Sequence, residues 1–338
     1  MAAPIALILD VDTGIDDALA LLYLCASPDV ELVAVGCTAG NVGAQQVAQN
    51  TMAVLELAGR RDVEVTLGRE VPLVRPLITA PETHGPKGIG YAELPEPTTR
   101  ISNRHSADLL IETARARPGE ITLVTLGPLT NVAVALLREP ALPSLLKQLV
   151  MMAGSYRSPG NTAPTSEWNV AVDPEAMAVV LAGWEAVADA PRPIALGLDV
   201  TERAKLTPDH LVELRRRAGG GPAQPILRFL DDALRFYMEF HSRYDGFYGA
   251  FIHDPLAVAS AVDPALVRSE ALAVEVELGG KWTTGETVTD WRRVWDRPPN
   301  LDVVVEARIE RFFDLFVGRI AALVENQRGD SLRTTSRA

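Results

Sequence analysis

The chain has 338 residues, of which 47% are hydrophobic and 22% charged, the proportions of a globular protein with a sizeable core. Its net charge of −12, from 32 basic and 44 acidic residues, argues against a nucleic-acid backbone or an anionic membrane as partner, but leaves a neutral small molecule open. Cys25 and Cys37 lie in apolar segments, so we expect no disulfide framework. The sequence shows neither a signal peptide nor an apolar stretch of membrane-spanning length, and we expect a cytoplasmic protein.

The first predicted strand ends in four carboxylates, namely Asp10, Asp12, Asp16 and Asp17. Asp10 and Asp12 lie two positions apart and therefore point to the same face of a strand. Gly14 permits a turn into a helix over 17–26, and helix capping alone would explain one acidic residue there. Four carboxylates in one partly buried site repel one another unless a cation lies among them. A hard divalent cation with oxygen ligands is the simplest solution.

Strands and helices then alternate through the first 200 residues. Apolar strands are predicted over 32–38, 63–67, 121–126, 146–152 and 194–199, and helices over 44–58, 106–117, 131–138 and 174–184. This pattern predicts an α/β fold with an open, mostly parallel, Rossmann-like sheet and helices on both faces, in which 194–199 is the last parallel strand. Residues 69–100 interrupt the alternation with six prolines and form a long loop that contains His84. His84 is a candidate site residue, although a surface histidine is an equally good interpretation.

The last third of the chain is predicted to be helical with a small antiparallel addition. Helices are expected over 207–241, with an interruption at 219–222, and over 253–261 and 306–326. Segments 270–278, 286–290 and 301–306 alternate apolar and polar residues, which predicts a small C-terminal antiparallel piece. No repeat or linker divides the chain, so we expect a single domain over 1–326. The polar residues 327–338 are expected to be a disordered tail.

Ligands of open parallel sheets bind at the carboxyl ends of the strands, and polar side chains gather at those positions here. They are Asp10, Asp12, Asp16, Asp17, Asn41, Asn161, Glu167, Asn169 and the helix start His253-Asp254. Each has an ordinary explanation as a cap or turn residue, but so many at strand ends indicate a site. Carboxylates and amides suit a hydroxylated, sugar-like substrate with Ca²⁺ or Mg²⁺, and no Cys/His cluster with zinc spacing is present.

The segment 10–18, Asp-Val-Asp-Thr-Gly-Ile-Asp-Asp-Ala, resembles the DxDxGxDDA signature of the inosine-uridine preferring nucleoside hydrolase family. Further matching segments follow in the same order at 40–41, 84–85, 127–131, 152–154, 161, 167–169, 173–175 and 253–257. Two positions depart from the family pattern. Ala153 replaces the first of two usual glycines, and Thr13 stands where proline is common.

The resemblance implies calcium-dependent hydrolysis of the N-glycosidic bond of ribonucleosides, with one Ca²⁺ per subunit. The implied metal ligands are Asp12, Asp17, the carbonyl of Leu126, and Asp254. Asp12 would also be the general base that takes a proton from the attacking water. The implied ribose-binding residues are Asp16, Asn41, Asn161, Glu167, Asn169 and Asp254. The family commonly forms homodimers or homotetramers, which we also expect here.

The other roles implied by the resemblance concern the base and the support of the ligands. His253 would act as a general acid or polarise the leaving base, and His84 would lie on the base side. Trp168 would line the base or the ribose 5′ side, although a packing role is an equal alternative. Asp10 would orient Asp17 or the loop behind the ligands. The loops near 75–90 and 222–252, on which base preference depends, cannot be placed from the sequence.

Two other functions remain open from the sequence. A phosphatase of the haloacid dehalogenase type would need threonine two positions after Asp12, whereas Thr13 comes one position early. A calcium-dependent nucleoside- or sugar-binding protein without turnover would share the binding residues. The intact acid and base positions favour an enzyme over this second alternative.

Overall fold

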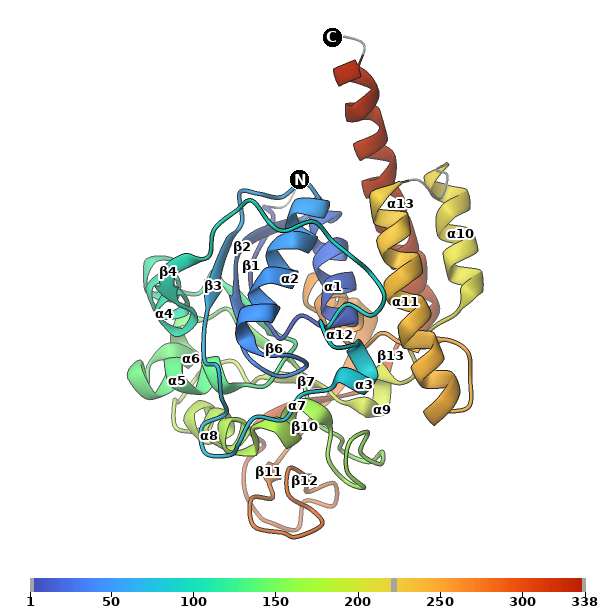
Figure 1. The fold of residues 1–338 in the computed structure, drawn as a ribbon. Coiled ribbons are helices and arrows are strands. Elements are labelled where there is room, and N and C mark those ends of the chain that lie inside the picture. The colour runs from blue at the N-terminus through green and yellow to red at the C-terminus, as the bar shows by residue number, and fades with distance from the viewer. Residues whose placement is uncertain (1–2, 220–223, 336–338) are drawn as a thin grey trace.

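The computed structural model describes residues 3–219 and 224–335, and within them a nine-stranded sheet forms the centre of the molecule (Figure 1). Its strand order is β10-β13-β7-β6-β5-β1-β2-β3-β4. The strands are β1 (Ile5–Val11), β2 (Val30–Cys37), β3 (Glu64–Leu67), β4 (Ser102–His105), β5 (Thr122–Thr125), β6 (Gln148–Met152), β7 (Ile194–Leu196), β10 (Val267–Leu272) and β13 (Leu301–Ala307). Two small antiparallel pairs lie outside it, β8 (Lys205–Leu206) with β9 (Ala250–Phe251) and β11 (Val274–Val276) with β12 (Thr287–Thr289).

The sheet separates two hydrophobic cores, and β1 contributes to both. Side chains alternate along a strand, so Leu7, Leu9 and Val11 pack into one core, while Ala6 and Ile8 pack into the other. All five side chains are buried. A strand covered on both faces needs apolar residues at successive positions, which explains the continuous apolar run at the start of the chain.

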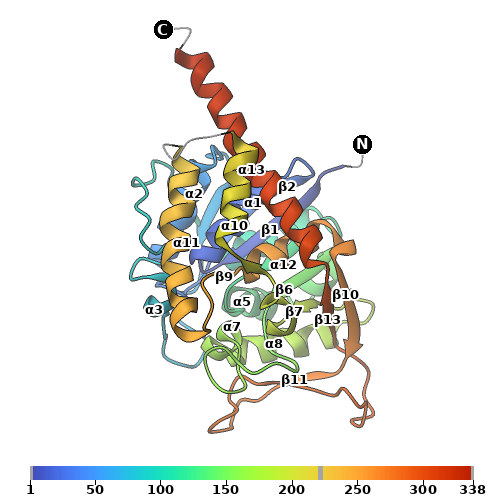
Figure 2. The same cartoon turned by 90° about the vertical axis from the view of Figure 1, so that its right-hand side faces the viewer.

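Helices cover both faces of the sheet (Figures 1 and 2). The first core contains side chains from α1 (Ile15–Cys25), α2 (Ala44–Leu57), α10 (Pro208–Ala218), α11 (Pro225–Tyr244), α12 (His253–Val262) and α13 (Ile309–Thr335). The second contains side chains from α4 (Ser106–Ala116), α5 (Thr130–Arg138), α6 (Leu142–Leu145) and α8 (Pro174–Glu185). The remaining short helices are α3 (Pro81–His84), α7 (Trp168–Val172), α9 (Leu198–Thr201) and the 3₁₀ turn η1 (Pro264–Leu266). In the described part of the chain, no helix is both long and apolar enough to cross a membrane.

The predicted α/β class and mostly parallel sheet are confirmed, but the C-terminal strands differ in detail. β13 pairs in parallel with β7, and β10 pairs antiparallel with β13, so both extend the main sheet. Residues 194–199 are therefore not the last parallel strand, and the separate antiparallel piece is limited to β11 and β12. β4, a parallel edge strand beside β3, was not predicted. Alternation along a segment indicates how it is buried, but not which strand it pairs with.

The C-terminal helix is longer than predicted. α13 continues to Thr335 and includes 327–335, where the sequence predicted disorder, while 336–338 lie outside the described residues. Once a helix has formed, each added residue gains a backbone hydrogen bond without a new nucleation cost, so polar residues can extend it. The predicted interruption at 219–222 falls between α10 and α11, and its positions 220–222 also lie outside the described residues.

Candidate active site

The strand order brings the predicted polar residues to one edge of the sheet. β1 lies between β2 and β5, and the direction of the crossovers reverses there, which is where open α/β sheets bind ligands. A cavity of about 520 Å³ opens at this edge. Ten of the predicted site residues line it: Asp16, Asn41, His84, Leu126, Asn161, Glu167, Trp168, Asn169, His253 and Asp254. Asp10, Asp12 and Asp17 are buried and are not among its lining residues.

Three buried carboxylates lie together beside the cavity, and two of them line it. Asp16, Asp17 and Asp254 offer oxygen atoms that all lie within 4.8 Å of one another, close enough to hold a metal ion. The first turn of α1 supplies two of them, and the first turn of α12 supplies Asp254. The Gly14 N–H donates to Asp17 Oδ2 at 2.8 Å, which fixes this carboxylate at the start of α1. Asp16 belongs to this group, as expected for one of the four clustered carboxylates, although the family resemblance implied it as a ribose ligand.

Asp12 lies beside this group, and only one of its two carboxylate oxygens has a hydrogen-bond partner among the described residues. Its Oδ2 accepts a hydrogen bond from the Asn41 N–H at 2.8 Å, whereas its Oδ1 is buried and has no partner among the described residues. Two glycines allow the chain to pass close to this carboxylate. A Cβ on Gly40 would lie 2.1 Å from Asp12 Oδ2, and one on Gly127 would lie 2.8 Å from its Oδ1. The turns after β2 and β5 are therefore shaped around the side chain of Asp12.

The electrostatics of these carboxylates fit a bound cation. Burial raises the pKa values of Asp12, Asp16 and Asp254 well above the ordinary aspartate range, and repulsion among the carboxylates raises them further. Burial also raises the pKa of Asp17, to about 6, although hydrogen bonds from the Gly14 and Asp12 N–H groups oppose this. A divalent cation removes the repulsion, and the free Oδ1 of Asp12 offers it a further ligand. Carboxylate and carbonyl oxygens suit a hard ion.

Asp10 supports the site from behind. Its Oδ1 accepts a hydrogen bond from Asn131 Nδ2 of α5 at 2.7 Å, and its Oδ2 is buried and finds no partner in the described part of the chain. Burial raises its pKa to about 7 in spite of this hydrogen bond. The same Asn131 also bonds the Cys37 carbonyl at 3.2 Å and accepts from the Arg69 N–H at 2.8 Å. Asp10 thus joins β1 to α5 and to the end of β2, and its hydrogen bond is not to Asp17.

The loop after β6 contributes polar groups that are already tied to the backbone. Glu167 caps α7, because its Oε1 accepts from the Asn169 N–H at 2.7 Å and its Oε2 from the Val170 N–H at 3.1 Å. The same Oε2 also accepts from the Gly154 N–H at 2.9 Å. Asn169 Nδ2 donates to the Leu126 carbonyl at 2.7 Å, which leaves that oxygen a second lone pair. Asn161 Oδ1 accepts from the Trp168 N–H at 2.9 Å. These bonds hold the loop against the ends of β5 and β6.

A second set of lining residues, called the aromatic end below, is rich in rings and was not predicted from the sequence. It comprises Tyr237, Phe240, His241, Tyr244, Asp245 and Phe251, together with His84 and His253. Tyr237 and His241, and likewise Phe240 and Tyr244, lie four positions apart on α11 and so share a face of the helix. That spacing could have indicated the site, but it is equally typical of a helix that packs on a core.

Both predicted histidines lie at this aromatic end. His84 Nδ1 accepts a hydrogen bond from the Ile15 N–H at 3.1 Å, and its ring lies 5.3 Å from that of Tyr237. His253 Nδ1 lies 2.8 Å from the hydroxyl of Thr201. Burial, together with the smaller effect of His241, lowers the pKa of each histidine to about 3. Both rings are therefore neutral at physiological pH.

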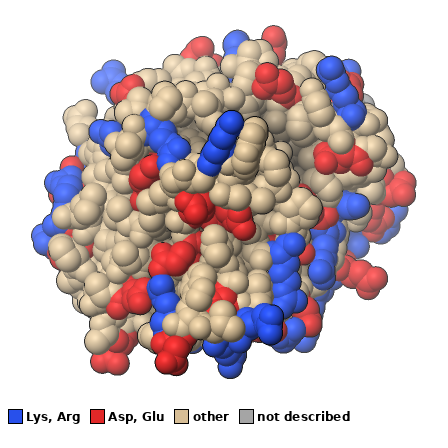
Figure 3. Space-filling model, turned by 90° about the horizontal axis from the view of Figure 1, so that it is seen from below, with Lys and Arg blue, Asp and Glu red and all other residues tan. Residues whose placement is uncertain are grey.

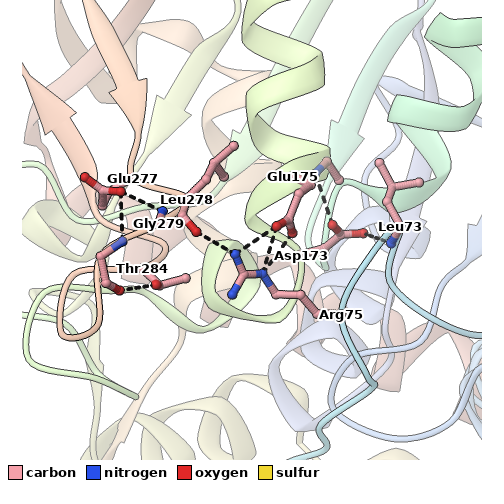
Figure 4. A network of polar contacts seen from close by, with 10 residues as sticks. Leu73, Arg75, Asp173, Glu175, Glu277, Leu278, Gly279 and Thr284 are labelled. Atoms are coloured by element: carbon pink, nitrogen blue, oxygen red, sulfur yellow. Dashed lines mark hydrogen bonds and ion pairs between the residues drawn. The ribbon is translucent and has the colours of Figure 1, made fainter.

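A polar network anchors the long loop that leads to the cavity (Figure 4). Arg75 Nε donates to both oxygens of Glu175 on α8, at 3.0 and 2.9 Å, and Arg75 Nη2 donates to the Leu278 carbonyl at 2.8 Å. Two positions earlier, the Leu73 N–H donates to Asp173, the residue that caps α8, at 2.9 Å. These contacts hold residues 73–75, in the loop that leads to α3, against α8 and the Leu278 carbonyl.

The surface around this side of the molecule is mixed in charge. Seen from below, acidic side chains lie near the middle of the face, with basic side chains interspersed among the others (Figure 3). The aromatic end of the cavity also contains two carboxylates, Asp245 and Glu202. Burial raises the pKa of Glu202 to about 7, with a further contribution from Asp245. An uncharged ligand suits such a cavity better than an anion.

Comparison with known proteins identifies the family. Residues 7–314 match the family model described as inosine-uridine preferring nucleoside hydrolase. The chain is 36% identical to an inosine-uridine preferring nucleoside hydrolase of Leishmania major over 96% of this chain and 100% of the relative. It is 37% identical to the pyrimidine-specific ribonucleoside hydrolase RihA of Escherichia coli K12, over 95% and 99% of the two chains.

A solved structure agrees with these sequence matches. The purine-preferring ribonucleoside hydrolase from Gardnerella vaginalis superposes with a TM-score of 0.86 at 31% identity, over 95% of this chain and 99% of that chain. The family match and both relatives cover almost the whole chain, and the fold of the solved structure is the one described above. The chain therefore belongs to the inosine-uridine preferring nucleoside hydrolase family and is an N-glycosyl hydrolase.

Proposed function

We propose that the protein catalyses calcium-dependent hydrolysis of the N-glycosidic bond of ribonucleosides, giving ribose and a free purine or pyrimidine base. The observation that carries this proposal is the pair of residue sets that line one cavity. One set offers buried carboxylates and amides, which suit vicinal hydroxyls, and the other offers aromatic rings, which suit a planar base. Membership of the family excludes the phosphatase alternative.

The residues that would hold Ca²⁺ are Asp12, Asp17, Asp254 and the carbonyl of Leu126. Asp17 and Asp254 belong to the cluster within 4.8 Å, and Asp12 supplies the unpartnered Oδ1. The Leu126 carbonyl lines the cavity beside them and keeps a free lone pair. The chemistry that such a cation supplies is neutralisation of the carboxylates, Lewis acidity toward water and anchoring of vicinal hydroxyls.

The roles of the surrounding side chains follow from their contacts. Asp12 takes a proton from the attacking water, and the Asn41 N–H holds this carboxylate in position through Oδ2. Asp16, Asn41, Asn161, Glu167, Asn169 and Asp254 hold the ribose hydroxyls. As the bond to the base breaks, the sugar gains oxocarbenium character. The carboxylates and carbonyls around it stabilise that positive charge, since they are already oriented by backbone hydrogen bonds.

The base departs toward the aromatic end. His84 and His253 flank it, and Trp168, which lines the same cavity, covers its edge or the ribose 5′ side. The tautomer of His84 is set by a hydrogen-bond partner outside the cavity, the Ile15 N–H. Because His84 Nδ1 accepts from a backbone N–H, its proton lies on Nε2, where it can donate to the base.

A ribose-release assay tests the proposal. Purified protein is incubated with inosine and with uridine, and reducing sugar is measured before and after chelation and after Ca²⁺ is added back. We expect turnover that the chelator abolishes and Ca²⁺ restores, and Asp12→Asn should be inactive under the same conditions. Binding of both nucleosides without release of ribose would instead support a binding protein without turnover.

Base preference and assembly need separate measurements. The named relatives prefer inosine and uridine, pyrimidines or purines, so family membership leaves the preference of this chain open. A kcat/KM panel over purine and pyrimidine ribonucleosides measures it as differential binding of the transition state. We also expect a homodimer or homotetramer in the cytoplasm. Light scattering after size-exclusion chromatography tests the assembly.

A further inference from the structure

The hairpin formed by β11 and β12 contacts the loop that follows β6, although the two segments are far apart in the sequence. That loop, residues 153–167, includes Asn161 and Glu167, which line the cavity. The hairpin residues 274–289, all of which the structure describes, are not among the residues that line it. Any effect of the hairpin on a ligand in the cavity must therefore pass through the loop.

A single hydroxyl joins the start of the loop to β12. Thr287 Oγ1 donates to the Ser155 carbonyl at 2.6 Å and accepts from the Ser155 N–H at 3.1 Å. Both residues are buried. A buried N–H and a buried carbonyl each need a partner, and here one side chain serves both. Removal of this hydroxyl alone would release the backbone of Ser155 from the hairpin.

The next three residues of the loop are held by two further elements. Trp291, which follows β12, donates from Nε1 to the Tyr156 carbonyl at 2.9 Å, and the Arg157 guanidinium lies 3.6 Å from the centroid of the Trp291 ring. Asp199 of α9 accepts hydrogen bonds from the N–H groups of Tyr156, Arg157 and Ser158 at 2.7 to 3.1 Å. The backbone of this segment is thus fixed before it reaches the cavity.

The end of the loop is fixed to the hairpin as well. Ser166 pairs with Glu286 in an antiparallel bridge, and its Oγ donates to the Thr284 carbonyl at 2.6 Å. Between the two anchored ends the chain turns tightly, because a Cβ on Gly160 would lie only 2.3 Å from the backbone N and O of Ser166. Residues 160–162, which line the cavity, are therefore held in place through contacts with the hairpin.

Asn161 shows what this loop can offer to a ligand. Its Oδ1 accepts from the Trp168 N–H, which leaves both protons on Nδ2 without a partner among the residues that the structure describes. The vicinal hydroxyls of a bound ribose belong with the carboxylates of Asp16, Asp17 and Asp254. The third hydroxyl of the ribose, on C5′, is then the one left for the loop, which takes no part in that carboxylate cluster.

We propose that the hairpin, through Thr287 and the adjoining Trp291, positions the loop after β6 for the 5′-hydroxyl of ribose, an inference that rests on the proposed function. Both are positioning residues, since they touch the loop and not the substrate. Binding energy from a group remote from the reacting bond can raise the rate by orienting the sugar. A displacement of the loop by about 1 Å would lose most of that contribution.

The test compares inosine with 5′-deoxyinosine, which lacks only the hydroxyl in question. The ratio of kcat/KM on the two nucleosides is measured for each variant, and it does not depend on how much of the protein is folded. Thr287→Val retains the branched shape of the side chain and removes the hydroxyl. We expect it to lower kcat/KM on inosine by about 10²-fold and to change that on 5′-deoxyinosine little.

Three more variants isolate the contact. Thr287→Ser retains the hydroxyl and should keep the wild-type ratio. Thr289→Val makes the same change two positions along β12, where the hydroxyl donates to the Thr287 carbonyl at 3.0 Å and not to the loop, so the ratio should again be that of the wild type. Trp291→Phe removes Nε1 but keeps a ring for Arg157, and it should lower the ratio as Thr287→Val does.

The remaining outcomes separate the two levels of the argument. A wild-type ratio in Thr287→Val would overturn the inference whatever its activity, since the hydroxyl would then have only a structural role. If that variant does not fold, a wild-type ratio in Trp291→Phe decides in the same way. Equal loss of the ratio in Thr287→Ser or Thr289→Val, or equal turnover of the two nucleosides by wild-type protein, would also overturn it. If wild-type protein releases sugar from neither nucleoside, the proposed function itself has failed.

Discussion

Replacing Gly40 by alanine should displace the carboxylate of Asp12. A Cβ at this position would lie 2.1 Å from Asp12 Oδ2 and 2.9 Å from Cδ of Pro128, whereas real Cβ atoms stay beyond 3.0 Å. The carboxylate or the turn after β2 must therefore move by at least 0.9 Å, the shortfall from that limit. The same movement disturbs the 2.8 Å hydrogen bond from the Asn41 N–H, which fixes Oδ2 and leaves Oδ1 free.

The expected cost follows from the size of this displacement. Moving a catalytic group by about 1 Å can lower the rate by about 10²-fold, so we expect kcat of Gly40→Ala to fall by about that factor. Gly43→Ala is the matched control in the same turn. Its added Cβ has no atom within 4 Å, and its backbone, at φ −64°, suits any residue. Ribose release from inosine is measured for both variants, with circular dichroism and thermal unfolding to verify their folds.

Two results would refute this reasoning. If Gly40→Ala keeps near wild-type kcat while Asp12→Asn is inactive, the position of Asp12 is not fixed by the close turn. If Gly43→Ala loses as much activity as Gly40→Ala, the effect belongs to the flexibility of the turn and not to the contact with Asp12.

Four further predictions concern catalysis, metal binding, pH and the loop. Asp12→Asn should lower kcat by about 10²–10⁴-fold in the ribose assay while the circular dichroism spectrum is unchanged, and near-normal turnover would remove Asp12 as the base. Adding Ca²⁺ at 100 times its Kd to chelated protein should raise the free energy of unfolding by about 2.7 kcal/mol, and an unchanged melting temperature would contradict the metal site. The pKa of Asp10 is raised from 3.8 to about 7, so its contribution to stability is complete below pH 3.8 and is lost as the pH rises through 7. Between pH 5 and 8 chelated wild type should lose about 3 kcal/mol relative to Asp10→Asn in urea unfolding, and parallel pH curves would contradict this. Arg75→Ala should raise KM with little change in melting temperature, because its partly exposed ion pair contributes only about 0–1 kcal/mol while it anchors the loop that leads to the pocket. An unchanged KM would argue against that anchoring role.

The sugar end of the cavity could be predicted because its residues follow the ends of parallel strands. Asp12 after β1, Asn41 after β2 and Leu126 after β5 are far apart in the sequence, but neighbouring strands of known direction bring their ends together. Ten of the predicted residues do line one cavity. Local hydrogen bonding could not be predicted in the same way. The grouping of Asp16 with Asp17 and Asp254 depends on where α12 starts relative to α1, which only the packed structure shows.

The base end could not be predicted because it depends on tertiary packing. α11 lies more than 200 residues after β1, and its aromatic face looks like that of any core helix until its position over the cavity is known. The pair formed by His241 and Asp245 likewise has an ordinary helical spacing. The parallel pairing of β13 with β7 could not be predicted either, since alternation in a segment does not specify its neighbour in the sheet.

The separate origin of the two cavity ends has a consequence for how the protein can be altered. The hydrolytic centre is built from strand ends and the first turns of α1 and α12, whereas one helix, α11, carries most of the aromatic residues opposite it. A library of variants confined to the inward face of α11 would therefore sample new leaving groups while the hydrolytic centre stays constant. The side chains of α11 that face the cavity can therefore be varied separately from the carboxylates of α1 and α12.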